Sequence, residues 1–151
     1  MFEILIETAT SADIPTLSDL LSVPFSQETE FTPDPEAQQR GLARIIGNPE
    51  IGIVLIARQG DQLIGMVNLL FTVSTALGER VALLEDMVVS PAGRGVGVGT
   101  KLLAEAIRRA RQHGCKRITL LTDQSNQQAQ RFYAKQGFTM SGMTPMRLLL
   151  A

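Results

Sequence analysis

The 151-residue sequence has few of the residues from which several kinds of functional site are built. It contains one cysteine, Cys115, so no disulfide framework can form within the chain. It also contains one histidine, His113, and no Cys/His cluster, so we expect no protein-held metal. The formal net charge of -1 gives no electrostatic support for non-specific nucleic-acid binding, and we expect no nucleic-acid partner.

Long hydrophobic runs are missing as well. The longest are far shorter than the roughly 20 residues that a membrane-spanning helix needs, so we expect no membrane partner. Residues 1–7 lack the basic region, apolar stretch and cleavage site of a targeting segment, which favours a cytoplasmic protein. The remaining balance, 44% apolar and 19% charged residues, is typical of a globular chain, and the length predicts one domain, residues 1–151.

The periodicity of apolar residues predicts an alternation of strands and helices. Ser11 and Asp13 can cap a first helix, Pro35 suits a first helical turn, and Gly114 suits a helix end. The predicted strands cover residues 3–7, 51–58, 63–72, 81–89, 117–122, 138–140 and 146–150; the predicted helices cover about 14–21, 35–46, 99–113 and 126–137, with a loop over 23–34. Hairpins followed by a β-α-β unit indicate a mixed sheet with helices on its faces.

Alternate glycines separate the strand over residues 81–89 from the amphipathic helix that follows: Gly93, Gly95, Gly97 and Gly99. Backbone N–H groups at a helix start lack partners and, with the helix dipole, attract phosphate. Glycine lets that backbone approach a ligand closely, and Arg94 adds a positive charge. The alternative is a glycine-rich turn that only joins a strand to a helix.

The glycine spacing excludes two common phosphate loops. A Rossmann fingerprint fails because the last glycine position falls on Val98, Thr100 or Leu102, and a Walker loop fails because Thr100-Lys101-Leu102 replaces Gly-Lys-Ser/Thr. The pattern that fits is Arg-x-x-Gly-x-Gly, formed by Arg94, Gly97 and Gly99. It resembles the pyrophosphate-binding motif of the GCN5-related N-acetyltransferase (GNAT) superfamily, as do the flanking residues 85–91 and 102–103.

A second stretch resembles the last helix of the same superfamily. It reads Asn-x-x-Ala-x-x-Phe-Tyr-x-x-x-Gly-Phe and runs from Asn126 to Phe138. The resemblance implies an α/β (α+β mixed) fold, with a mostly antiparallel central sheet of six to seven strands and about four helices. It also implies acetyl-CoA as the acyl donor. The expected cofactor-binding residues are Met87, Val88, Val89, Arg94, Gly95, Val96, Gly97, Val98, Gly99, Thr100 and Asn126.

Two side chains acquire roles by this resemblance. Asn126 offers its amide to a pantetheine carbonyl, and Tyr133 protonates the leaving thiolate. Asn126 can instead be a helix N-cap, and Tyr133 can be a core aromatic residue with a hydroxyl that reaches solvent. Backbone amides of residues 87–89 are expected to stabilise the oxyanion of the reaction.

Transfer of an acyl group to an amine requires the neutral amine, which is under about 0.1% of an alkyl amine at pH 7. Glu85, placed at the beginning of its strand, is our candidate general base, while alternation in a strand directs the neighbouring Asp86 to the other face. Three alternatives stay open: Asp86 faces the pocket instead, a water relays the proton, or Glu85 is only a structural carboxylate.

Acidic residues gather in the predicted loop between the first two helices. Glu28 and Glu30 are expected to attract an ammonium group, which favours a small amine acceptor; the alternative is a solvated loop. Two other functions compete with small-molecule N-acetylation, namely acetylation of a protein N-terminus or lysine, and coenzyme A binding without turnover. The apolar residues 81–89 and 146–150 make a homodimer plausible.

Overall fold

The computed structural model describes residues 3–27 and 32–151, with the side chains of residues 24–27 excepted. It forms two compact units, one up to Leu121 and one over Thr122–Ala151. The first unit contains β1 (Ile4–Thr8), a 3-10 turn (Ser11–Asp13), α1 (Ile14–Gln27), α2 (Pro35–Ile46), β2 (Gly52–Gln59), β3 (Gln62–Ser74), β4 (Glu79–Val89), a second 3-10 turn (Pro91–Gly93), α3 (Val98–Gln112) and β5 (Ile118–Leu120). The second contains α4 (Gln127–Ala134).

The strands of the first unit form one sheet in the order β1-β2-β3-β4-β5. The first three pairings are antiparallel, and β4 pairs with β5 in parallel through the crossover helix α3. This confirms the mixed, mostly antiparallel α/β sheet expected from the hairpins and the later β-α-β unit.

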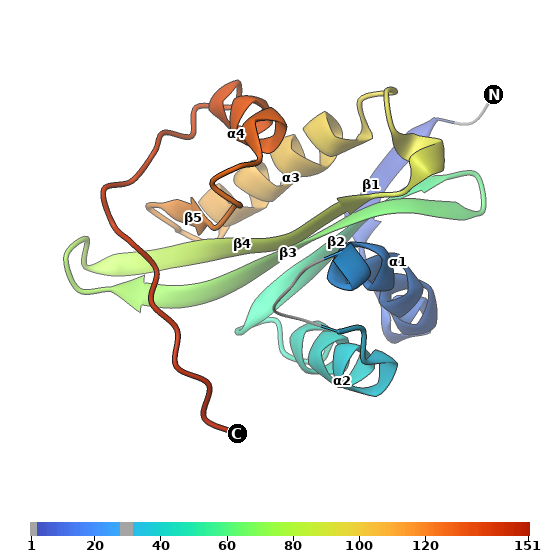
Figure 1. Ribbon diagram of the computed structural model, residues 1–151, viewed down its shortest axis with the longest axis horizontal. Helices are drawn as coiled ribbons and strands as arrows, with labels where there is room; N and C mark the ends of the chain where they lie inside the picture. Colours follow the sequence, from blue (N-terminus) through green and yellow to red (C-terminus); the bar gives the residue numbers. More distant parts are fainter. Residues whose placement is uncertain (1–2, 28–31) are drawn as a thin grey trace. The chain divides into compact units, whose positions relative to one another are not determined.

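Helices cover the two faces of this sheet (Figure 1). On one face, Val54, Ile56 and Met66 of the sheet pack with Leu17 of α1 and Leu42 of α2 in a buried cluster. On the other face lies α3, whose apolar stripe of Val98, Leu102, Leu103, Ala106 and Ala110 is fully buried. Different helices therefore cover the two faces of the sheet. The glycine-rich loop lies on the face covered by α3, because it leads directly into that helix.

The sheet differs from the expectation in its number of strands. In the part of the chain that the structure describes it has five strands rather than six to seven. The strands predicted over residues 138–140 and 146–150 are wrong, since both segments lack regular secondary structure. An apolar segment becomes a strand only where its backbone pairs with a neighbour, and Pro145 removes one donor between the two segments.

The first helix is longer than predicted. It continues to Gln27, so the loop expected over residues 23–34 begins later. One contact lies in the added part: Gln38 of α2 donates to the Ser22 hydroxyl (3.2 Å), which in turn donates to the Ser18 carbonyl (3.0 Å). The second helix, Pro35–Ile46, matches its prediction, with Asp34 as N-cap and proline at its first position.

None of the helices in the described ranges is long and apolar enough to cross a membrane.

Candidate active site

The strand β4 has two halves that are paired differently. Its first half pairs with β3 on one side and with β5 on the other, where the ladder ends at Leu84–Leu120. Its second half, residues 85–89, continues to pair with β3 as far as Gly65–Val89. No β5 residue pairs with this second half in the described sheet, so its outer edge offers backbone groups to a ligand.

The backbone of Val89 points toward this outer edge. Ser90 donates its N–H to the Ile64 carbonyl of β3 (2.9 Å), and peptide groups alternate in direction along a strand. Val89 therefore directs its N–H and carbonyl away from β3. The Arg94 Nε group, which donates to the Val89 carbonyl (3.4 Å), agrees with this direction. A ligand carbonyl at this edge can accept the Val89 N–H.

The glycine-rich loop leaves the end of β4 and enters α3. Gly95 and Gly97 have φ angles of +80° and +83°, a left-handed conformation that favours glycine. Gly97 is the N-cap of α3 and makes no side-chain cap hydrogen bond. The first intrahelical bond runs from the Lys101 N–H to the Gly97 carbonyl (3.1 Å), which leaves the preceding N–H groups for a ligand. Uncapped amides at a helix start fit the diphosphate of coenzyme A.

Close packing against β3 holds the beginning of α3 in place. A Cβ atom at Gly65 would lie 2.9 Å from Leu102 and 3.1 Å from Val98, so glycine lets the helix rest on the strand. A Cβ atom at Gly93 would lie 3.0 Å from the Val89 side chain and 3.1 Å from the Ile64 carbonyl oxygen. These two contacts bring the loop residues beside the open half of β4, as the sequence motif requires.

A β-bulge interrupts the open half of β4. Asn68 of β3 pairs with Glu85 and Met66 pairs with Val88, so β4 holds one residue more than β3 between these pairs. Asp86 lies at the bulge with φ of +56°, and its Oδ2 accepts a hydrogen bond from Asn68 Nδ2 (2.7 Å). The strict alternation on which the opposite placement of Asp86 and Glu85 was based is interrupted by the bulge, and the Asp86 carboxylate lies against Asn68 of β3.

The position of Glu85 also differs from its prediction. It lies within β4, which begins at Glu79, rather than at the start of a strand. Its side chain is exposed, whereas Asp86 is half-buried. Asn68 is not among the predicted site residues, although an asparagine between Val67 and Leu69 in an otherwise apolar strand is a visible signal.

The other two predicted side chains belong to the second unit. Asn126 is the N-cap of α4, and its Oδ1 accepts the Ala129 N–H (3.0 Å). This matches the N-cap alternative and leaves Nδ2 as the group that can donate to a carbonyl. The Tyr133 ring makes edge contacts with Phe132 and Phe138 at centroid distances of 5.1 and 5.7 Å. Burial raises the pKa of the Tyr133 phenol, so the hydroxyl stays protonated at neutral pH.

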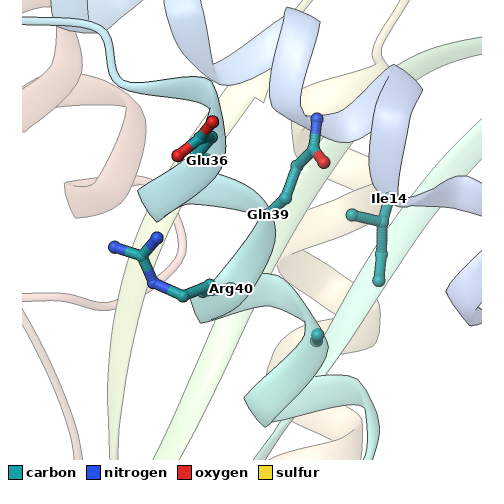
Figure 2. A pocket seen from close by; sticks show the side chains of 5 residues that line it. Ile14, Glu36, Gln39 and Arg40 are labelled. Carbon is teal, nitrogen blue, oxygen red and sulfur yellow. The ribbon is translucent and has the colours of Figure 1, made fainter.

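Two acidic residues lie outside the described residues. Glu28 and Glu30, predicted to bind the acceptor, belong to the segment 28–31. The two helices that flank this segment in the sequence, α1 and α2, form a groove of about 470 Å³. It is lined by Ile14, Glu36, Gln39, Arg40 and Ala43 (Figure 2). It contains no predicted site residue. Within the described ranges, no group of three His, Cys, Asp or Glu side chains can hold a metal ion.

Comparison with known proteins agrees with this geometry. Residues 14–138 match the model of the acetyltransferase (GNAT) family. The uncharacterized N-acetyltransferase YhfO of Bacillus subtilis is 32% identical over 117 residues, which cover 76% of this chain and 78% of that protein. The aminoalkylphosphonate N-acetyltransferase of Salmonella typhimurium is 28% identical over 133 residues, or 88% of this chain and 83% of that one.

Among solved structures, a transcriptional regulator from Bacillus halodurans C-125 superposes with a TM-score of 0.83 and 28% identity. The match covers 98% of this chain and 100% of that one. The matched stretch contains the open half of β4, the glycine-rich loop and α4, which are the parts that carry the two sequence motifs. The chain belongs to the GNAT acetyltransferase family.

Proposed function

We propose that this protein, as one domain over residues 1–151, transfers an acetyl group from acetyl-CoA to a small primary amine. The amine attacks directly, in a complex that holds both substrates. The observation that carries the proposal is the uncapped helix start at Gly97, next to the half of β4 that lies beyond its ladder with β5. Similarity to an aminoalkylphosphonate N-acetyltransferase supports a small amine as the acceptor.

The residues of the first unit fit acetyl-CoA, which supplies a thioester with a carbonyl carbon open to attack. The N–H groups of residues 95–100 bind the diphosphate, and Arg94 adds a positive charge at an exposed position. The Val89 N–H, directed outward from β4, donates to the carbonyl oxygen as negative charge develops on it. Met87 and Val88 belong to the same strand edge, and Asn126 Nδ2 donates to a pantetheine carbonyl.

The proton balance needs one base and one acid. A protonated amine first gives a proton to a carboxylate, Glu85 or Asp86, directly or through one water. The neutral nitrogen then forms the C–N bond, the C–S bond breaks, and Tyr133 donates its phenol proton to the leaving sulfur. The second nitrogen proton leaves as the amide forms and returns, through water, to the Tyr133 phenolate. The raised pKa of Tyr133 suits this role, because the protonated form persists above neutral pH. No metal is needed for these steps.

The remaining parts of the proposal concern the surroundings of the site. Glu28 and Glu30 attract the ammonium form of the acceptor, so their replacement by glutamine raises the KM for cationic acceptors. The protein works in the cytoplasm. A homodimer that covers residues 81–89 or 146–150 is compatible with the exposure of Leu83, Met146 and Leu148.

Calorimetry with acetyl-CoA and a free-thiol release assay with a panel of primary amines test this function. We expect saturable binding and thiol release that depends on the amine. The Tyr133→Phe variant should bind acetyl-CoA normally while kcat falls about 10²- to 10⁴-fold, the range for a general acid. Binding without amine-dependent thiol release would instead indicate a coenzyme A-binding module, and the absence of binding would refute the proposal.

A further inference from the structure

Asn68 is an unusual residue for its position in the sheet. It lies in the middle of β3 between the fully buried Val67 and Leu69, and only 3% of it is exposed. A buried amide group costs free energy unless its donors and acceptor all find partners. Asn68 does not meet that condition, because its Oδ1 atom is buried without a hydrogen-bond partner among the described residues.

The one side-chain bond recorded for Asn68 is directed at the β-bulge. Its Nδ2 donates to Asp86 Oδ2 at 2.7 Å. Since an ionised carboxylate can only accept hydrogen bonds, this contact fixes which end of the amide faces Asp86. The orphaned Oδ1 therefore follows from the orientation that serves the carboxylate.

Asp86 is itself held in a costly conformation. It is the one non-glycine residue with a positive φ in the described chain, at +56°. Two unfavourable features, a left-handed aspartate and an incompletely bonded asparagine, thus meet in a single hydrogen bond. Departures of this kind from local rules concentrate where function requires them.

We propose that Asn68 is a positioning residue for Asp86, and that Asp86 rather than Glu85 accepts the proton of the acceptor amine. This inference depends on the proposed function. The Asn68 amide donates to the Asp86 carboxylate and so aims it from the bulge, next to the Val89 edge. One proton moves from the ammonium group to Asp86, directly or through one water, and leaves a neutral amine and a neutral carboxylic acid. Glu85 is exposed, and solvent can hold its carboxylate in many orientations.

Steady-state kinetics of the Asn68→Leu variant test the inference. Leucine has a similar volume but cannot donate to Asp86, so we expect kcat to fall about tenfold or more. The KM for acetyl-CoA, and its calorimetric Kd, should stay within about twofold, because the cofactor contacts lie in the loop. This split separates positioning of the base from general damage to the fold, which would weaken cofactor binding as well.

A double-mutant cycle with Asp86→Asn identifies the partner. If Asn68 acts through Asp86, adding Asn68→Leu to Asp86→Asn lowers kcat no further. Additive losses would overturn the inference, as would a larger loss of kcat in Glu85→Gln than in Asp86→Asn. Ser74→Ala is the matched control, since Ser74 is a buried polar residue of β3 that bonds to the Leu77 N–H, and it should leave kcat unchanged.

A measurement without turnover checks the hydrogen bond itself. In ¹⁵N-labelled protein, the Asn68 side-chain NH₂ signals should shift in Asp86→Asn and stay in place in Ser74→Ala; unshifted signals in both would overturn the inference. Failure of the two proposals is distinguishable. A wild-type protein that releases no thiol with any amine removes the proposed function, whereas normal turnover by Asn68→Leu removes the role of Asn68 alone.

Discussion

The two halves of β4 differ in how their backbones pair with neighbouring strands. The half from Glu79 to Leu84 pairs with β3 without interruption, pairs with β5 at residues 82–84, and buries Val81, Ala82 and Leu84. The half from residue 85 to 89 has a neighbour on one side, holds a bulge, and leads into the glycine-rich loop. Regular pairing uses up backbone groups, and irregular pairing releases them. One strand thus combines a regularly paired segment with a second segment whose backbone and carboxylate groups are available to substrates.

The largest expected effect concerns the regular half. Leu84 is 2% exposed, so Leu84→Ala should lower the free energy of unfolding by about 2–5 kcal/mol, as the loss of a buried leucine does. Val88→Ala, in the irregular half, removes a smaller and half-buried side chain and should cost less. Urea denaturation of both variants measures this. An equal loss would mean that the two halves contribute equally to stability.

Two glycines at either end of β4 sharpen the comparison. Gly78, with φ of +67°, precedes the regular half, and Gly97, with φ of +83°, follows the irregular one; neither has an atom near its missing Cβ. Left-handed alanine costs about 1–2 kcal/mol. We expect Gly97→Ala to raise the Kd for acetyl-CoA by about 5- to 30-fold, the equivalent of that cost. Gly78→Ala should lower the melting temperature and leave the Kd unchanged, and a matching rise in its Kd would contradict the comparison.

A smaller effect is expected at Arg94, whose side chain is exposed beside the open edge. An exposed cation that pairs with an anion contributes about 0.2–1 kcal/mol, and salt screens the interaction. Arg94→Gln should therefore raise the Kd for acetyl-CoA about two- to fivefold in dilute buffer, and the difference should shrink near 1 M salt. A difference that is independent of salt would mean that Arg94 acts through its bond to the Val89 carbonyl instead.

The smallest effect is expected at Leu83, which lies in the regular half but is 39% exposed. Threonine suits a strand and is polar, so Leu83→Thr should change stability by no more than about 0.5 kcal/mol. Size-exclusion chromatography of the same variant tests the proposed homodimer. A clear loss of stability together with a smaller apparent size would show that a partner covers this part of β4.

The sequence predicted the regular parts of the molecule well. Apolar periodicity and end signals located α2, α3 and the strands β2 to β4 to within a few residues, because local propensity and burial agree there. The loop motif was equally accessible, since positive φ at Gly95 and Gly97 is what glycine permits.

Other features depend on contacts that no local pattern encodes. The bulge at Asp86 arises from the register of β3 against β4, and no glycine marks its position. The extension of α1 includes Ser22, whose hydroxyl accepts a bond from Gln38 of α2, 16 residues away. Asn68 was visible as a polar residue in an apolar strand, but its partner lies 18 residues away across a sheet register that the sequence leaves open.

Because Gly65 has no side chain, the beginning of α3, just after the glycine-rich loop, packs directly on β3. A Cβ atom there would lie 2.9 Å from Leu102 and 3.1 Å from Val98, so any side chain at position 65 would press on the first two turns of α3. The angle at which diphosphate-binding amides are presented is therefore set one layer beneath them. Substitutions confined to the loop would leave this contact between β3 and α3 in place, whereas bulk at position 65 would change it without altering the motif.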